Sequence, residues 1–414
     1  MKAEITDGEL LRDVFHAYFD ARRNKRNTIN QLEFEIEFEH RLFELAAEIR
    51  NRTYKVGQSV CFIVDHPVKR EIFAADFKDR VVHHLIYRYI NPLFERKLIR
   101  DCYSCRKGMG TSDGVERIRH HMRSVTRNFT RPAYVLKLDI QGYFMSIDRQ
   151  RLYRTVERIV HQGHGKNTQR TELELFLLRE VIFADPTENC RVKGSNGDWE
   201  GLPPSKSLFH SPEGCGLPIG NLTSQMFSNI YLADFDHYVK RTLGIEHYGR
   251  YVDDFYFMHP SRQRLVEVRD AVDRYLRENH GLIVHPKKIY LQDVRHGVTF
   301  LGAHVKPYRA YAKSKTLGQI RNNIRRIDRS LIAPHTEEPS PQRKEKARSV
   351  VNSYLGYLGQ FKTHGIRREI WCDAKQLRRH FRIDAATLKI SPRKIRAISA
   401  QTAPPDLRGL FPED

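Results

Sequence analysis

The chain has 414 residues, of which 71 are Lys or Arg and 50 are Asp or Glu, so its formal net charge is +21. This length allows two or three domains with a sizeable core, and the positive charge makes a polyanion such as nucleic acid the expected partner. From position 301 onward the chain holds 24 basic and 10 acidic residues. We therefore expect this tail to contact phosphates.

The sequence also argues against a membrane protein and against a disulfide-rich one. No segment approaches the ~20 apolar residues of a membrane span, and the N-terminal MKAEITDGELLRDVF lacks the apolar core of a signal peptide. Six cysteines in so long a chain are not a disulfide framework, and the pair Cys102 and Cys105 has no second pair to complete a zinc site. We expect a cytoplasmic protein with free thiols.

Helical and extended segments alternate along the first part of the chain. Apolar residues recur at helical spacing over 8–50, which predicts an N-terminal helical segment. VGQSVCFIVDHP then predicts a strand, and DRVVHHLIYRYINPLFERKLI predicts a long amphipathic helix ending near Arg100. AYVLKLDI predicts a buried strand with Asp139 at its carboxyl end, followed at once by the helix IDRQRLYRTVERIV.

The second part begins with residues 185–215, whose Gly, Pro, Ser and Asn content predicts a loop or hairpin insertion. A helix over LTSQMFSNIYLADFDHYVKRTLG follows, then two strands joined at YVDD within 246–259, and a helix over 262–280. VTFLGAHV predicts one more strand. From about position 315, KTLGQIRNNIRRIDRSL and RKEKARSVVNSYLGYLGQF predict basic helices in a separate domain.

Two adjacent carboxylates, Asp253 and Asp254, interrupt the aromatic and β-branched run GRYVDDFYFM. One Asp would suffice for a hairpin turn, whereas paired carboxylates repel each other unless a hard cation binds them. Mg²⁺ takes oxygen ligands, typically one or two carboxylates with substrate phosphates, and Asp139 offers a third carboxylate. On neighbouring strands, these three could hold two Mg²⁺ ions ~4 Å apart for attack of a 3′-hydroxyl on an α-phosphate, which is polymerase chemistry.

Five segments occur in the order of the palm motifs of reverse transcriptases and resemble them: LKLDIQGYF, GLPIGNLTSQ, YVDD, GLIVHPKK and FLGAHV. The similarity spans residues 60 to about 305. It implies an α+β right-hand polymerase fold and RNA-directed DNA synthesis with two Mg²⁺ ions, for which Mn²⁺ can substitute. It also implies four regions: an N-terminal helical segment (1–55), fingers (56–132), a palm with the insertion (133–310), and a basic helical thumb with a C-terminal tail (311–414).

The resemblance also implies roles for single residues. Asp139, Asp253 and Asp254 would be the catalytic metal ligands, with Ile140 at the same metal site, and FLGAHV resembles the primer grip. Phe144 follows Asp139 by five residues, where the family keeps the bulky ring that excludes ribonucleotides; a core aromatic residue is the alternative. Contacts with the incoming nucleotide are expected from Lys69, Arg70, Arg80, Phe144, Ile219, Gly220, Gln225 and Lys288.

Two of these positions indicate one branch of the family. Ile219 stands where reverse transcriptases commonly have Gln, and Gln225 stands where many have Pro; with SKSLFHSPEGCGLPIGNLTSQ, this resembles the reverse transcriptases of diversity-generating retroelements. The resemblance implies errors at template adenines and a small basic accessory protein, expected as an oligomer, besides template RNA, cDNA and deoxynucleoside triphosphates. The alternatives are drift in a faithful enzyme, a defence-associated bacterial reverse transcriptase and a non-catalytic RNA-binding scaffold.

A row of arginines marks the basic tail. Arg321, Arg325 and Arg329 lie at i, i+4 and i+8 of one predicted helix, so they share a face. We expect this face to follow a phosphate backbone of the template and primer. A solvated surface is the alternative for each arginine alone.

Overall fold

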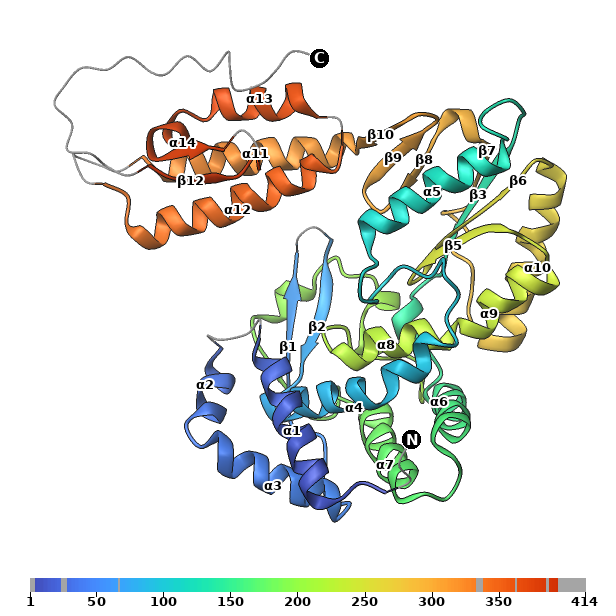
Figure 1. Ribbon diagram of the computed structural model, residues 1–414, viewed down its shortest axis with the longest axis vertical. Helices are drawn as coiled ribbons and strands as arrows, with labels where there is room; N and C mark the ends of the chain where they lie inside the picture. The colour runs from blue at the N-terminus through green and yellow to red at the C-terminus, as the bar shows by residue number, and fades with distance from the viewer. Residues whose placement is uncertain are drawn as a thin grey trace. The chain divides into compact units, whose positions relative to one another are not determined.

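The computed structural model (Figure 1) describes residues 4–23, 28–65, 68–332, 338–361, 363–384 and 387–393. They form helices and largely antiparallel sheets, so the α+β class expected from the sequence is confirmed. The expected basic thumb and C-terminal tail lie partly outside the described residues, at 333–337 and 394–414. None of the described helices is long and apolar enough to cross a membrane.

The chain divides into two compact units. The first comprises 1–114 with 131–292, and the second comprises 115–130 with 293–414. The expected fingers and palm ranges therefore belong to a single unit for most of their length, and the boundary between them stays a prediction.

The N-terminal segment is helical, as predicted, and consists of α1 (Asp7–Arg22), α2 (Ile29–Glu35) and α3 (Phe38–Arg50). Thr6 and Glu9 exchange hydrogen bonds at the start of α1, which satisfies backbone N–H groups that the helix leaves free. The apolar face of α1 packs on α4, so this segment belongs to the main core.

The first unit also contains further helices. Their bounds are α4 (Phe77–Glu95), α6 (Arg149–His164), α7 (Gln169–Phe183), α8 (Leu222–Tyr231), α9 (Ala233–His237) and α10 (Arg262–His280), and α5 (Thr111–Val125) leads into the second unit. Short helical turns are η1 (Tyr143–Ser146), η2 (Asn196–Trp199), η3 (Pro204–Lys206), η4 (Leu208–His210) and the π-turn η5 (Tyr238–Thr242).

Two sheets position the site. A small sheet has the order β2-β1-β4, built from β1 (Ser59–Val64), β2 (Arg70–Ala74) and β4 (Cys190–Val192). A second sheet has the order β5-β6-β3-β7, built from β3 (Tyr134–Asp139), β5 (His247–Tyr251), β6 (Asp254–His259) and β7 (Tyr290–Asp293). The inner strands β3 and β6 are antiparallel and mostly buried, which explains their nearly continuous apolar sequences.

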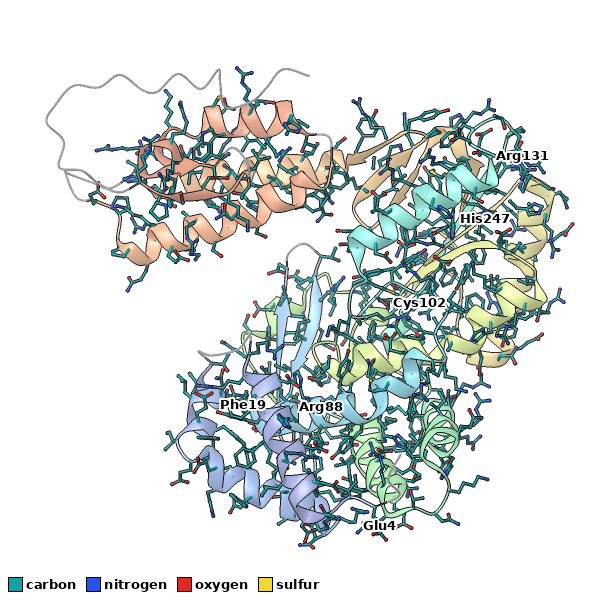
Figure 2. All side chains as sticks on the ribbon, in the orientation of Figure 1. Glu4, Phe19, Arg88, Cys102, Arg131 and His247 are labelled. Atoms are coloured by element: carbon teal, nitrogen blue, oxygen red, sulfur yellow. The ribbon has the colours of Figure 1, made fainter. Side chains whose placement is uncertain are left out.

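Two predicted elements end earlier than the sequence suggested. The long helix α4 ends at Glu95, not near Arg100, because the chain then turns to pair with β5: the Arg250 N–H donates to the Asp101 carbonyl at 2.8 Å. Cys102, labelled in Figure 2, is buried at this turn. VTFLGAHV is a hairpin and not one strand, because Leu301 and Gly302 adopt positive φ angles of 51° and 82°.

The second unit combines a small antiparallel sheet with helices. Its strands are β8 (Val298–Phe300), β9 (Ala303–Lys306) and β10 (Arg309–Ala312), preceded by η6 (Val294–His296). The predicted basic helices are present as α11 (Ser314–Ser330) and α12 (Pro341–Gly359). The sequence did not predict the elements α13 (His364–Asp373), α14 (Lys375–His380), β11 (Phe381–Ile383) and β12 (Ile390–Pro392).

Candidate active site

Three aspartates meet at one end of the inner strands. Asp139 is the last residue of β3 and lies directly opposite Asp254, the first residue of β6. Tyr251 of β5 is also opposite Asp254, so Val252 and Asp253 form a two-residue hairpin turn. The register therefore brings a strand-end carboxylate and the paired carboxylates of YVDD together, although Asp139 and Asp253 are 114 positions apart in the sequence.

The hairpin turn has an unfavourable backbone conformation. Val252 has a φ angle of 56°, which places a β-branched residue where such turns usually have glycine. A residue held in this region costs about 1–3 kcal/mol and persists only where its surroundings impose it. The Ile140 N–H donates to the Asp253 carbonyl at 3.2 Å, and the Val252 carbonyl accepts from the Arg250 guanidinium at 3.0 Å. These contacts hold Asp253 in place.

A buried ion pair lies behind the turn. Arg250 and Asp236 are both fully buried, with Nη2 and Oδ2 at 2.6 Å and Nε and Oδ1 at 2.8 Å. Nη2 also donates to the Asn229 carbonyl at 3.0 Å. Burial opposes the charge of Arg250, but Asp236, together with Cys102 and Tyr248, raises the pKa of the guanidinium well above its usual value.

Two lysines pair with the aspartates. Lys137 Nζ lies 2.9 Å from Asp254 Oδ2, and Lys288 Nζ lies 2.7 Å from Asp139 Oδ1. Lys288 is brought there by its own segment, because the His285 N–H donates to the Asp139 carbonyl at 2.8 Å. The sequence predicted Lys288 as a contact of the incoming nucleotide and did not single out Lys137, although strand periodicity puts Lys137 on the same face as Asp139, two residues away.

The carboxyl groups have an environment that suits a cation. Burial and the nearby charge of Asp139 together raise the pKa of Asp253 to about 6. Burial also raises the pKa of Asp254 to about 6, although Lys137 acts to lower it. Asp254 Oδ1 is buried and accepts no hydrogen bond. An unpaired carboxylate oxygen beside other carboxylates is the donor that a hard divalent ion prefers.

The described residues contain no group of three His, Cys, Asp or Glu side chains already arranged around a metal position. In the structure, Asp139 and Asp254 each face a lysine. The donor set nevertheless fits a hard cation, since its members are oxygen ligands with one unsatisfied acceptor. Ile140 is buried beside them, and its N–H is the donor to Asp253.

Phe144, Ile219 and Gly220, which we expect to contact the nucleotide, form one side of the site, which we call the nucleotide wall. Phe144 lies in η1, is half-buried, and its carbonyl accepts from the Leu217 N–H at 2.8 Å. The Ile219 carbonyl accepts from the Phe73 N–H at 2.9 Å. Gly220 has a φ of 127°, and a Cβ there would lie 2.9 Å from the Phe73 carbonyl oxygen. The segment PIGN therefore lies directly against strand β2.

The basic residues expected at the triphosphate differ in their availability. Arg70 is exposed at the start of β2, whereas Lys69 Nζ donates to the Glu200 carbonyl at 2.6 Å. Arg80 Nε donates to the Ala75 carbonyl at 3.0 Å, and burial lowers the pKa of Arg80. Gln225 is exposed on α8, where its Oε1 accepts from Cys105 Sγ at 3.4 Å.

The arginine row belongs to the second unit and is described there alone. Arg321 Nη2 is paired with Glu369 Oε2 at 2.8 Å. Arg325 and Arg329 are exposed on α11, and all three arginines line a cavity of about 250 Å³ with Asp328 and Asp373 among its other residues. The shared face predicted from the spacing is present, with Arg321 engaged in an ion pair.

A comparison with protein-family models places the chain in a family. Residues 69–305, more than half of the chain, match the family model described as reverse transcriptase (RNA-dependent DNA polymerase). A comparison with curated proteins finds no match. Reverse transcriptase domains use divalent metal ions and have the right-hand polymerase fold.

Two telomerase structures are among the similar solved structures. Apo telomerase from Candida tropicalis has 12% identity and a TM-score of 0.47, over 78% of this chain and 59% of that chain. Telomerase from Candida albicans, in complex with a TWJ fragment of telomeric RNA, has 13% identity and a TM-score of 0.43, over 80% of this chain and 58% of that chain. This chain thus spans less than two thirds of each telomerase chain.

The unsatisfied oxygen of Asp254 leads to a test of cation binding without turnover. We expect Mn²⁺ or Mg²⁺ to raise the Tm of the parent protein, because an ion at a hundred times its Kd stabilises the folded state by about 2.7 kcal/mol. Asp254→Asn should lose most of this rise, whereas Asp270→Asn, on the exposed part of α10, should keep it. Thermal unfolding at increasing ion concentration measures the difference; equal shifts in all three proteins would place the ion elsewhere.

Proposed function

Because the chain belongs to the reverse transcriptase family, we propose that it is an RNA-directed DNA polymerase that copies a template RNA into cDNA by two-metal nucleotidyl transfer. The observation that supports this best is the register of the inner strands, with Asp139 opposite Asp254 and Asp253 at the adjoining turn. Neither the turn nor the core needs three carboxylates at this point, whereas phosphoryl transfer does.

Asp139, Asp253 and Asp254, with Ile140 beside them, are the residues that we propose to hold two Mg²⁺ ions, with Mn²⁺ as a substitute. When bound, the ions supply neutralisation of phosphate charge and a lowered pKa of the attacking 3′-hydroxyl. Until the ions bind, Lys137 and Lys288 compensate the negative charge of the carboxylates. Lys288 is long and exposed, so it can move from Asp139 to a phosphate oxygen of the nucleotide.

The other residues expected at the nucleotide select and orient it in this proposal. Lys69 and Arg70 bind the triphosphate, and the Phe144 ring occupies the space that a 2′-hydroxyl would need. Gly220 lets the chain approach β2 closely, because a side chain there would meet the Phe73 carbonyl. Arg80 contributes by holding the Ala75 carbonyl at the end of β2 and the start of α4.

The central test is DNA synthesis on an RNA template with a DNA primer. Asp139→Asn and Asp253→Asn should each reduce kcat by ~10³-fold or more, because each removes stabilisation of transition-state charge. Primer extension under single-turnover conditions measures the loss. Asp270→Asn is the matched control and should extend at the parent rate. A near-parent rate in either site variant would rule out the proposed chemistry.

A finer proposal concerns fidelity. We propose that the protein is the error-prone polymerase of a diversity-generating retroelement, which works with a small basic accessory protein. The support is sequence resemblance around Ile219 and Gln225, together with the position of Ile219 in the nucleotide wall. An Ile side chain can only pack there, so a mispaired nucleotide loses one source of rejection compared with Gln.

The fidelity proposal predicts that Ile219→Gln copies template adenines more accurately. A lost polar contact of this kind is worth ~1 kcal/mol, about fivefold in discrimination. Sequencing of cDNA made by parent and variant from one adenine-containing template measures the change. Errors at template uracil serve as the internal control, and unchanged adenine errors would mean that Ile219 is only a packing residue.

The basic second unit is the proposed grip on the template and primer. Neutralising the exposed pair with Arg325→Gln and Arg329→Gln should lower the slope of log affinity against log salt by ~0.7–0.9 for each lost phosphate contact. Salt titration of RNA binding measures this slope. The same change at Arg154 and Arg262, exposed on α6 and α10, is the control. If only the control changes the slope, the nucleic acid follows the first unit.

A further inference from the structure

The insertion between α7 and the PIGN segment is closed at its base by one arginine. Arg149, at the start of α6, donates to Asp185 Oδ2 at 2.6 Å, to the Cys215 carbonyl at 3.0 Å and to the Gly216 carbonyl at 3.1 Å. Asp185 and Cys215 are the first and last residues of the predicted insertion, and Gly216 follows it. Residues 186–214, which we call the insertion segment, therefore leave and re-enter the fold at one point.

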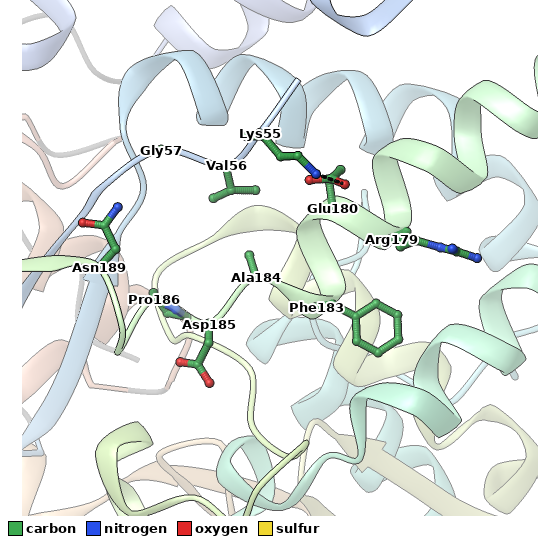
Figure 3. A pocket seen from close by; sticks show the side chains of 10 residues that line it. All are labelled: Lys55, Val56, Gly57, Arg179, Glu180, Phe183, Ala184, Asp185, Pro186 and Asn189. Atoms are coloured by element: carbon green, nitrogen blue, oxygen red, sulfur yellow. Dashed lines mark hydrogen bonds and ion pairs between the residues drawn. The ribbon is translucent and has the colours of Figure 1, made fainter. Parts of the chain in front are cut away.

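The first residues of the insertion segment lie against the chain that enters β1. Figure 3 shows Asp185, Pro186 and Asn189 around a cavity of about 330 Å³ that is also lined by Lys55 and Gly57. Asn189 Oδ1 accepts from Gln58 Nε2 at 3.1 Å, and β4 then pairs with β1 in parallel. The insertion segment thus supplies β4, the third strand of the small sheet, before the chain continues to the nucleotide wall.

A buried carboxylate anchors the far part of the insertion segment. Glu71 of β2 is fully buried and accepts hydrogen bonds from Trp199 Nε1 at 2.7 Å, Ser207 Oγ at 2.8 Å and the Leu208 N–H at 2.6 Å. All three donors come from the insertion segment. Burying a carboxylate is costly unless its oxygens are hydrogen-bonded, so these donors explain how Glu71 is tolerated in a strand.

The anchored residues support the nucleotide wall from behind. Leu208 forms one apolar cluster with Cys61, Phe73 and Met145. The side chains packed against this cluster include Trp199 of the insertion segment and the two wall residues Phe144 and Ile219. A displacement of Leu208 or Trp199 would therefore leave Phe144 and Ile219 without part of their packing.

Two further contacts connect the insertion segment to the site. The Ser205 carbonyl oxygen lies 2.7 Å from where a Cβ on Gly142 would be, so η3 closely approaches the turn two residues before Phe144. On the other side, the Glu200 carbonyl accepts from Lys69 Nζ at 2.6 Å. The insertion segment thus contacts both Gly142, close to Phe144, and Lys69, which we expect at the triphosphate.

We propose that the insertion segment is part of the incoming-nucleotide pocket and that Glu71 is the positioning residue that holds it there. This inference rests on the proposed polymerase function. Glu71 acts through Trp199, Ser207 and Leu208, since its oxygens are occupied by these donors. Its effect is on how firmly Phe144 and Ile219 are placed, and hence on nucleotide affinity and selectivity.

The test compares Glu71→Gln with the parent. The Gln amide has nearly the same volume as the Glu carboxylate. Its NH₂ group, however, replaces one of the two acceptor oxygens and faces a hydrogen-bond donor of the insertion segment. We expect a ~10-fold weaker Kd for deoxynucleoside triphosphate, which corresponds to the loss of one hydrogen bond to a charged group, and a severalfold smaller preference over ribonucleotides. Trp199→Phe keeps a ring and removes one donor, so it should shift both quantities in the same direction by less.

Nucleotide affinity is measured by calorimetric titration of the complex with template and a dideoxy-terminated primer, so that it needs no turnover. The preference over ribonucleotides comes from kcat/KM in primer extension. The control is Glu174→Gln, because Glu174 is also buried but is bonded to His164 and Arg170 on α6 and α7. It should leave nucleotide Kd and selectivity unchanged, whatever its effect on Tm.

The outcomes separate the two proposals. A parent that binds the nucleotide but does not extend contradicts the polymerase function and leaves the comparison of Kd values intact. Parent-like Kd and selectivity in both Glu71→Gln and Trp199→Phe overturn the role of Glu71, even if both variants unfold at a lower temperature. A parent that binds no nucleotide overturns both proposals.

Discussion

The buried ion pair between Arg250 and Asp236 is the interaction on which the site geometry depends. Its guanidinium reaches the carbonyls of Asn229 and Val252, so a single side chain connects α8 and α9 to the turn that carries Asp253. Removing one partner would leave an uncompensated buried charge, at a cost of about 3–5 kcal/mol. The same interaction holds Val252 in a backbone conformation that it would otherwise avoid.

A second constraint is electrostatic. The burial that raises the pKa values of Asp253 and Asp254 also makes their negative charge expensive without a cation. Lys137 and Lys288 supply that compensation from within the chain. Lys137 lies on β3, whereas Lys288 lies on an exposed segment, so the two counter-charges differ in how readily they can be withdrawn. A bound cation can therefore replace the positive charge of a lysine at the carboxylates without a change of fold.

The sequence predicted the parts of the site that depend on local pattern. Asp139 at a strand end, the YVDD turn and the helix over 262–280 follow from hydrophobic periodicity and turn chemistry, and the structure has them. Glu71 was missed because its partners lie far along the sequence, and Arg250 because its pairing with Asp236 depends on how α9 packs against β5; the signal for both was a charged residue inside a strand. The hairpin in VTFLGAHV was missed because its turn has a positive φ at Leu301, a conformation that a leucine in the sequence does not indicate.

The order of strands has a consequence for local opening of the protein. β3 and β6 are the inner pair of a four-stranded sheet, whereas β2 is an edge strand of a smaller one. Amides in the inner strands can exchange with solvent only when the sheet opens cooperatively, while edge strands open at lower free energy. The backbone of Asp139 and Asp254, which end the inner strands β3 and β6, should therefore open at higher free energy than that of β2. Arg70, at the exposed start of β2, lies in a strand that can open at lower free energy than the inner strands.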